Sequence, residues 1–305
     1  MKKKLILGID IGATNTKLGI VSQKGEILES SSFKTESKKG FDFFLQNLKS
    51  ACAKLTLNYS VSAVGVGAPD YNVVSGNIEN GTNLAWKCAP LRGELEKIFD
   101  CPVYLHNDAN IAAVGEKKFG AAQGVDDFIV VTIGTGIGTG AFVQGRLLTG
   151  KSGMACEAGH LVVEVDGRPC GCGAKGHLEA YASVTAIKES VRKTLGYDLF
   201  FSEIINRYQA DDGPIEAIVK SAAQFLGVGL AQMQSILLPE LIILAGGGSN
   251  LGLKYKKEVE RAFMSAAFKP FQNKTQLKLS EISAKHGAII GAAALGLEGL
   301  GSIDY

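Results

Sequence analysis

The sequence carries almost no excess charge of either sign. Its 32 Lys and Arg residues and 30 Asp and Glu residues give a net charge of +2 over 305 residues. Because the two signs are interspersed, the charge pattern offers no basic face for nucleic acid and no attraction to a membrane surface. Long hydrophobic runs are also absent. The most apolar stretch, at 230–248, contains Gln, Pro and Glu and divides into a helix and a strand, which excludes a membrane span.

Signals for secretion and for disulfides are missing too. The start, MKKKLILGID, has an apolar run that Asp10 interrupts after a few residues, which is too short for a signal peptide, and no cleavage site follows. Six cysteines are present, but Cys52, Cys88, Cys101 and Cys156 are scattered along the chain. This scatter favours reduced thiols over disulfides, and we therefore expect a cytoplasmic protein.

What is present is the composition of an ordinary folded protein, with 46% apolar and 20% charged residues, long enough for one large or two medium domains. Strand-like segments alternate with segments of helical periodicity, which predicts an α/β protein with a mostly parallel sheet. Strands are expected within 4–34 and at 61–69, 102–108, 127–143, 241–245 and 276–283, and helices at 40–57, 90–99, 109–120, 252–268 and 287–297 and over much of 184–237.

The same local sequence pattern occurs twice, as DIGATNTKLGIV at 10–21 and IGTGIGTGAFV at 133–143. Each is an apolar strand, a Gly/Thr turn and a second apolar strand. Such an internal duplication predicts two similar lobes. No Pro/Ser-rich linker separates them, so the pattern alone places the boundary only near 110–120.

Three glycine-rich turns follow apolar strands and are candidates for gripping phosphate. In the first, at 10–17, Gly12 allows close approach of a ligand, while the side chains of Thr14 and Thr16 offer hydroxyls to phosphate oxygens. Asp10 is placed to meet a magnesium ion. The second turn lies at 132–140 and the third at 246–248, the latter suited to the flat face of a nucleoside. The first turn also reads as a plain hairpin, and it lacks the spacing of a Walker A loop.

Asp108 lies in the sequence HNDAN at 106–110, where a predicted strand ends and a helix begins. One interpretation is an N-cap, a frequent role for Asp. The other is a general base that takes a proton from a substrate hydroxyl, with Asn107 bonding a neighbouring hydroxyl. The two interpretations are compatible.

A third cluster consists of His160, Cys170, Cys172 and His177, which fall within eighteen residues. Two imidazoles and two thiols are ligands that tetrahedral zinc prefers. The Gly-rich loop between them has little structure of its own, and a bound metal would hold it in place. With four protein ligands the metal would be structural. The alternative is that the four residues are near one another only in sequence.

Together these segments resemble the ROK family (repressors, open reading frames and sugar kinases), and within it the glucokinases. The resemblance covers essentially the whole chain and rests on these segments: DIGATNTK, GVGAPD, GTNLAW, HNDAN, TIGTGIGTG, EAGH, CGCGAKGHLE and LAGGG. It implies an actin-like, hexokinase-like fold of two ribonuclease H-like lobes with a cleft between them. The lobes are expected at 1–118, completed by the helix at 287–305, and at 119–286 with the zinc-binding loop.

The resemblance also implies ATP-dependent phosphorylation of a hexose at O6, with Mg²⁺ and structural Zn²⁺, by a protein that commonly forms homodimers. Asp108 takes the position of the catalytic base. Hexose contacts are implied for Asn83, Asn107, Asp108, Glu157, His160 and Glu179. Nucleotide contacts are implied for Asp10, Gly12, Thr14, Thr16, Gly134, Thr135, Gly136, Gly246 and Gly247.

Two positions depart from the family pattern. His177 stands where a third Cys is usual, which zinc tolerates, and Asp70 stands where Gly is common, near the expected sugar pocket. Glucose is the expected acceptor, with N-acetylhexosamine or fructose as alternatives, and polyphosphate or another nucleotide remains open as donor. The alternative that is not an enzyme is a sugar-sensing transcriptional repressor of the same family. It would need a helix-turn-helix domain, for which the expected phosphate turn at Asp10 leaves no room.

Overall fold

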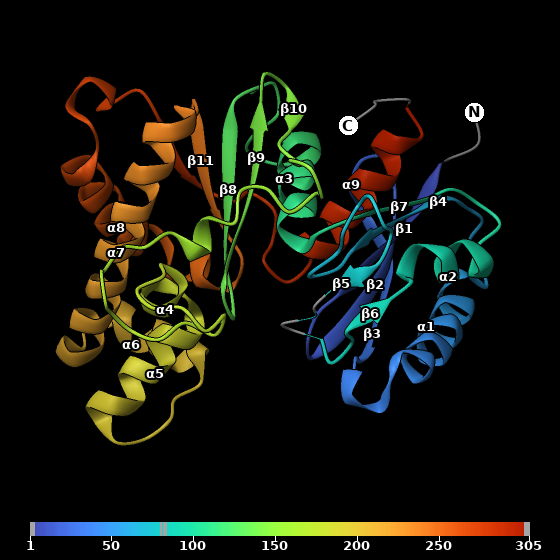
Figure 1. The fold of residues 1–305 in the computed structure, drawn as a ribbon, viewed down its shortest axis with the longest axis horizontal. Coiled ribbons are helices and arrows are strands. Elements are labelled where there is room, and N and C mark those ends of the chain that lie inside the picture. The colour runs from blue at the N-terminus through green and yellow to red at the C-terminus, as the bar shows by residue number, and fades with distance from the viewer. Residues whose placement is uncertain (1–3, 80, 82–83, 302–305) are drawn as a thin grey trace. The chain divides into compact units, whose positions relative to one another are not determined.

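The computed structural model describes residues 4–79, 81 and 84–301, which form two compact units (Figure 1). The first unit comprises the residues up to Gln123, the segment Arg146–Cys156 and the residues from Lys285 onward. The second comprises Gly124–Gly145 and Glu157–Ala284. In the described part of the chain, no helix combines the length and apolarity that crossing a bilayer requires.

The first unit is built on a five-stranded sheet in the order β3-β2-β1-β4-β7. Neighbouring pairs β1/β2 and β2/β3 are antiparallel, whereas β1/β4 and β4/β7 are parallel. The strands are β1 (Leu5–Ile11), β2 (Asn15–Val21), β3 (Ile27–Lys34), β4 (Val61–Gly67) and β7 (Val103–His106). The antiparallel hairpin β5 (Ile78–Glu79) and β6 (Cys88–Ala89) lies in the connection between β4 and β7.

The central strands β1 and β4 are almost continuously apolar and buried, which gives the sheet two covered faces. On one face, Leu7 and Ile9 belong to the same core cluster as Phe44 and Leu95, which come from two different helices. On the other face, Ile6 clusters with residues of a late helix. The helices and short 3₁₀ turn of this unit are η1 (Ser37–Lys39), α1 (Phe41–Thr56), α2 (Leu91–Ile98), α3 (Asp108–Phe119) and α9 (Gly287–Gly299).

Helix α9 packs unusually close to the sheet because glycines face it. A methyl group placed on Gly65 of β4 would lie 1.7 Å from the carbonyl oxygen of Ala292, and one on Gly8 of β1 would lie 2.4 Å from that of Ile289. Both distances are far below any real carbon–oxygen contact. Glycine at these two positions is therefore required for the helix to cover the sheet.

The second unit repeats the arrangement. Strands β9, β8, β11 and β12 are neighbours in that order, with β8/β9 antiparallel and both β8/β11 and β11/β12 parallel. This matches β2-β1-β4-β7 in order and direction, so the duplication predicted from the two Gly/Thr turns is confirmed in the topology. The strands are β8 (Phe128–Ile133), β9 (Ile137–Val143), β11 (Leu241–Ala245) and β12 (Gln276–Leu279). The short strand β10 (Arg146–Leu147) follows β9 in the chain and belongs to the segment Arg146–Cys156 of the first unit.

The prediction of mostly parallel sheets is wrong, since each sheet is mixed. The reason is local: a short Gly/Thr turn returns the chain antiparallel to the strand it has just left, whereas a parallel partner needs a long crossover. The remaining elements of the second unit are η2 (Ala158–His160), α4 (Glu179–Ala182), α5 (Val184–Leu195), α6 (Phe201–Gln209), α7 (Gly213–Leu237), η3 (Gly247–Leu251), α8 (Gly252–Ala266) and η4 (Lys269–Phe271).

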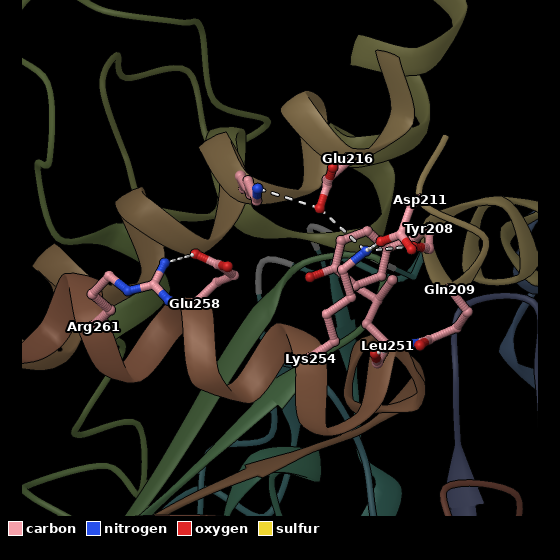
Figure 2. Close-up of polar contacts among 9 residues, drawn as sticks. Tyr208, Gln209, Asp211, Glu216, Leu251, Lys254, Glu258 and Arg261 are labelled. Carbon is pink, nitrogen blue, oxygen red and sulfur yellow. Dashed lines mark hydrogen bonds and ion pairs between the residues drawn. The ribbon is translucent and has the colours of Figure 1, made fainter. Parts of the chain in front are cut away.

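Polar contacts brace the helices around the turn that follows β11 (Figure 2). The Nζ atom of Lys254 on α8 lies 2.6 Å from Asp211 Oδ1 and 3.2 Å from Glu216 Oε1, and donates to the carbonyl oxygen of Tyr208. Nearby, the Gln209 side chain donates to the carbonyl oxygen of Leu251 at 2.7 Å. This last bond ties the end of η3, and with it the 246–248 glycines, to α6.

Candidate functional site

Two acidic side chains lie at the same edge of the first sheet. In the register of β1, β4 and β7, Asp10 pairs with Gly67 and Gly67 pairs with His106, so the three residues form one row across parallel strands. Asp108 follows His106 by two residues. The carboxyl ends of adjacent parallel strands are where α/β sheets bind ligands.

The surroundings shift the pKa of both carboxyl groups. Burial, and then the charge of Asp108, raise the pKa of Asp10 to about 6, with Lys17 opposing the shift. The protein packed around Asp108 raises the pKa of that carboxyl, a hydrogen bond from the Ala109 N–H lowers it, and the charge of Asp70 raises it. Asp108 keeps contact with solvent, which screens part of these effects. A carboxylate with a raised pKa is a stronger base, and both groups hold their protons at higher pH than exposed aspartates do.

The start of α3 presents Asp108 to solvent. Asn107 is the N-cap: its Oδ1 accepts from the backbone N–H of Asn110 at 2.7 Å. Asp108 is the first helical residue, and its Oδ1 accepts from the N–H of Ala109 at 2.9 Å. The N-cap interpretation of Asp108 is thus wrong, because the neighbouring Asn fills that role. Asp108 is exposed, whereas Asn107 is buried.

His106 at the end of β7 is buried and neutral. Burial lowers its pKa to about 4. Its Nδ1 accepts from the backbone N–H of Asn107 at 3.0 Å, so the ring proton belongs on Nε2. The sequence did not single out this residue, although a histidine inside a polar run at a strand end was a visible signal.

The turn between β1 and β2 has an exposed and a buried side. Gly12 donates its N–H to the carbonyl oxygen of Asn15, and Thr14 is exposed. Thr16 is fully buried, with its hydroxyl 3.0 Å from that of Thr35, which also donates to the carbonyl oxygen of Gly12 at 2.6 Å. Thr14 is therefore accessible to a ligand, whereas Thr16 supports the turn from beneath. Thr35, absent from the predicted set, is the residue that ties the turn to β3.

In the second unit, the turn after β8 and the turn after β11 lie against each other. Gly246 has φ +79°, and a methyl group on it would lie 2.8 Å from the carbonyl oxygen of Ile133. Ile133 immediately precedes Gly134, whose N–H donates to the carbonyl oxygen of Gly136. Thr135 at the tip is exposed, as expected for a residue that meets a ligand. Gly247 is partly exposed and has open space around its Cα.

Glu179 connects this turn to the cysteine loop. Its Oε2 would lie 2.6 Å from a methyl group placed on Gly136, so the carboxylate stands directly over that glycine. Its Oε1 accepts from the thiol of Cys170 at 2.9 Å. Glu179 opens helix α4 and is partly exposed. Glu157, which precedes η2, is exposed.

The four proposed metal ligands converge. Ligand atoms of His160, Cys170, Cys172 and His177 all lie within 4.8 Å of one another. The closest pairs are His160 Nδ1 to His177 Nδ1 at 3.2 Å, Cys172 Sγ to His177 Nδ1 at 3.3 Å and Cys170 Sγ to His160 Nδ1 at 3.8 Å. Tetrahedral zinc with bonds of about 2.0–2.3 Å keeps its ligands about 3.3–3.8 Å apart.

An antiparallel bridge between Val162 and His177 brings the two halves of the loop together. His160 is the last residue of η2. The donor set and its spacing fit a closed structural metal site.

The predicted residues therefore divide between the two units. The first unit holds Asp10, Gly12, Thr14 and Asp108 at or near one sheet edge, and the second holds the two glycine turns, Glu179 and the metal-ligand group. Asn83 lies outside the described residues. Asp70 was noted only as a departure from the family pattern, yet its charge reaches Asp108. It has φ +56°, which explains why glycine suits this position elsewhere.

Comparison with known proteins gives consistent results. The model of the ROK family matches residues 6–298. A glucokinase from Halalkalibacterium halodurans is 31% identical, covering 95% of this chain and 94% of its own length. A xylose repressor from Caldicellulosiruptor bescii is 25% identical, covering 95% of this chain and 77% of its own length.

Among solved structures, a ROK family glucokinase from Streptomyces griseus, in complex with glucose and AMPPNP, superposes with a TM-score of 0.88. It is 29% identical, covering 97% of this chain and all of that chain. The fold prediction is therefore confirmed: the chain has the actin-like, hexokinase-like α/β fold with two sheet-containing lobes.

Proposed function

This chain belongs to the ROK family, and on that premise we propose that it transfers the terminal phosphoryl group of ATP to O6 of a hexose, with glucose as the preferred acceptor. The observation that carries the proposal is the position of Asp108, exposed at the first turn of α3 and beside Asp10 at the carboxyl edge of the sheet. A ROK glucokinase of the same fold that binds glucose and AMPPNP supports the donor and acceptor classes.

On the acceptor side, Asp108 takes the proton of the attacking hydroxyl. Its raised pKa strengthens it as a base, and its contact with solvent leaves it accessible to a sugar. Hydroxyls near C1 to C3 donate to Glu157 and Glu179, with His160, Asn107 and Asn83 as further contacts. Carboxylates and amides of this kind suit a sugar because its hydroxyls are hydrogen-bond donors.

On the donor side, the turns bind phosphate through backbone N–H groups and threonine hydroxyls. Gly12 and Thr14 serve from the first unit, with Thr16 holding the turn from beneath. Gly134, Thr135 and Gly136 serve from the second, while Gly246 and Gly247 leave room for the nucleoside. Mg²⁺ bound with ATP, near Asp10, would neutralise charge on the phosphates. Positioning and charge neutralisation are what phosphoryl transfer chiefly requires.

The metal-ligand group of His160, Cys170, Cys172 and His177 holds one structural Zn²⁺. Its role is to fix the loop between η2 and α4, and so to place Glu179 and His160 for the sugar. Because all four ligands come from the protein, the ion activates no water. His160 would serve both as a ligand and as a sugar contact.

A second function is favoured by the xylose repressor, which matches 95% of this chain. A sugar-sensing role would need hexose binding but no turnover. Two measurements separate it from the kinase: ADP release across a panel of hexoses with ATP or polyphosphate, and the turnover of Asp108→Asn. We expect ATP with glucose to give the highest kcat/KM, and Asp108→Asn to lose about 10²–10⁴-fold in kcat while still binding hexose.

Three results would contradict parts of this proposal. A higher kcat/KM for N-acetylglucosamine, N-acetylmannosamine or fructose would reject glucose and leave a ROK sugar kinase. Turnover of Asp108→Asn within a few-fold of the wild type would reject the base. Hexose binding without ADP release from any acceptor would favour the sensor. Sedimentation of the purified protein tests the homodimer that the family resemblance implies.

A further inference from the structure

We propose that Asn110 is a positioning residue for Asp108, because its amide ties the turn that carries this carboxylate to the segment Arg146–Cys156. The inference rests on the proposed function, in which Asp108 is the base. Asn110 is fully buried and touches no solvent, so it acts through its neighbours and not on the substrate.

The amide of Asn110 makes one bond within the turn and one to a distant segment of the chain. Its Nδ2 donates to Nδ1 of His106 at 3.0 Å and to the carbonyl oxygen of Gly153 at 3.0 Å. Its backbone N–H donates to the side chain of Asn107. The two residues that precede Asp108 are therefore both bonded to Asn110, which fixes the backbone from which the Asp108 side chain extends.

The chemistry of these partners requires an amide. The carbonyl of Gly153 is an acceptor, and Nδ1 of His106 is also an acceptor because it already receives the N–H of Asn107. Asn is the short side chain that carries two N–H donors on one nitrogen. Oδ1 of Asn110 is buried and has no hydrogen-bond partner among the described residues.

The segment Arg146–Cys156, to which Asn110 is bonded, is followed in the chain by a proposed sugar contact. Gly153 is buried with φ +83°, and its neighbour Ser152 accepts from the N–H of Val73, which anchors the segment to the first unit a second time. The chain reaches Glu157 four residues after Gly153. One buried amide thus bonds both the turn of the proposed base and the chain that runs toward a proposed sugar contact.

The molecule supplies a matched control. Gln234 on α7 is 1% exposed, and its Nε2 also makes two bonds, to the carbonyl oxygen of Phe271 at 3.0 Å and to Thr275 Oγ1 at 2.9 Å. Its Oε1 is likewise buried without a partner among the described residues. Gln234→Ala therefore removes the same kind of buried amide from the second unit, where its bonded partners are not residues of the proposed site.

The test compares steady-state kinetics of folded Asn110→Ala and Gln234→Ala with glucose and ATP. We expect both variants to melt a few degrees lower, but only Asn110→Ala to lose kcat, by about 10- to 100-fold, since small misplacements of reacting groups cost this much. KM for ATP should stay within about twofold. A kcat of Asn110→Ala within about threefold of that of Gln234→Ala overturns the proposal.

Asn110→Asp gives a second readout that a purely structural role would not move. The new carboxylate has no proton to donate to the Gly153 carbonyl or to His106 Nδ1. Uptake of one proton, shared between this carboxylate and His106, restores one donor. The ratio of its kcat to that of the wild type should therefore rise as the pH falls from 8 to 6, and a ratio independent of pH overturns the proposal. This arm also applies if Asn110→Ala does not fold. Asp108→Asn, assayed in parallel, separates failure of the proposed base from failure of the positioning role.

Discussion

Gly136→Ala should weaken hexose binding while leaving the second unit folded. A methyl group at this position would lie 2.6 Å from Oε2 of Glu179. Ordinary contact begins at 3.4 Å, so the oxygen has to retreat by about 0.8 Å. A displacement of that size takes a hydrogen bond of about 2.8 Å beyond its useful range. Glu179 can make this movement because the clash is with the end of a flexible side chain.

The expected loss follows from the charge of Glu179. A hydrogen bond to a charged group contributes about 1.5–3 kcal/mol, which corresponds to about a 10- to 150-fold rise in the Kd for the sugar. Calorimetric titration of glucose without nucleotide measures it directly. Gly134→Ala is the control from the same turn, because a methyl group on Gly134 meets no atom of the described structure within 4 Å. Its hexose affinity should equal that of the wild type.

The result that would refute this reasoning is a Gly136→Ala protein that binds glucose as tightly as the wild type. Glu179 would then not be a sugar contact. A large fall in melting temperature for Gly136→Ala alone would indicate instead that the carboxylate cannot move away from the added methyl group.

Three further outcomes are expected. Burial raises the pKa of Asp10 in the folded protein to about 6, above its value in the unfolded chain, so ionisation of this carboxyl lowers stability as the pH rises. In thermal unfolding, Asp10→Asn should therefore stabilise the protein by up to about 3 kcal/mol at pH 8 and by far less at pH 4. The same substitution should abolish phosphate transfer. Asp70→Asn removes a charge that raises the pKa of Asp108, so the acidic limb of the kcat profile should move to lower pH; an unmoved limb rejects the coupling. Metal analysis should find one zinc per chain, and His177→Cys should retain it. His177→Ala should lose the zinc and show a lower melting temperature and a weaker affinity for the sugar. Folded, active protein without zinc would reject the site.

Much of the fold was accessible from the sequence because its signals are local. The Gly/Thr turns each sit between apolar strands, and their repetition predicted the shared topology of the two units. The metal-ligand group was predictable for the same reason. Its four residues fall within eighteen positions, so a single loop brings them together without any contact between distant parts of the chain. Apolar periodicity likewise marked α1, α3 and α8.

What the sequence did not reveal depends on pairings between distant segments. Asn110 bonds Gly153 across 43 positions, and Thr16 is bonded to Thr35 across 19. A threonine in a turn looks the same in sequence whether it faces a ligand or the core, and only the register of β2 with β3 decides. The assignment of Arg146–Cys156 to the first unit had no signal in composition either. The influence of Asp70 on Asp108 depends on strand neighbours that local patterns do not specify.

The late position of α9 makes folding of the first unit wait for most of protein synthesis. Its glycine-lined contact joins β1 and β4 to a helix that begins at Gly287, and a ribosome needs on the order of 10–40 s to cover the intervening chain. Until then Ile6, Val21 and Ala63 lack the helix that covers them in the finished protein. The residues of the second unit have all been made by that point, so it can fold first. The nascent first unit is accordingly the part that most needs protection from aggregation while the chain is being made.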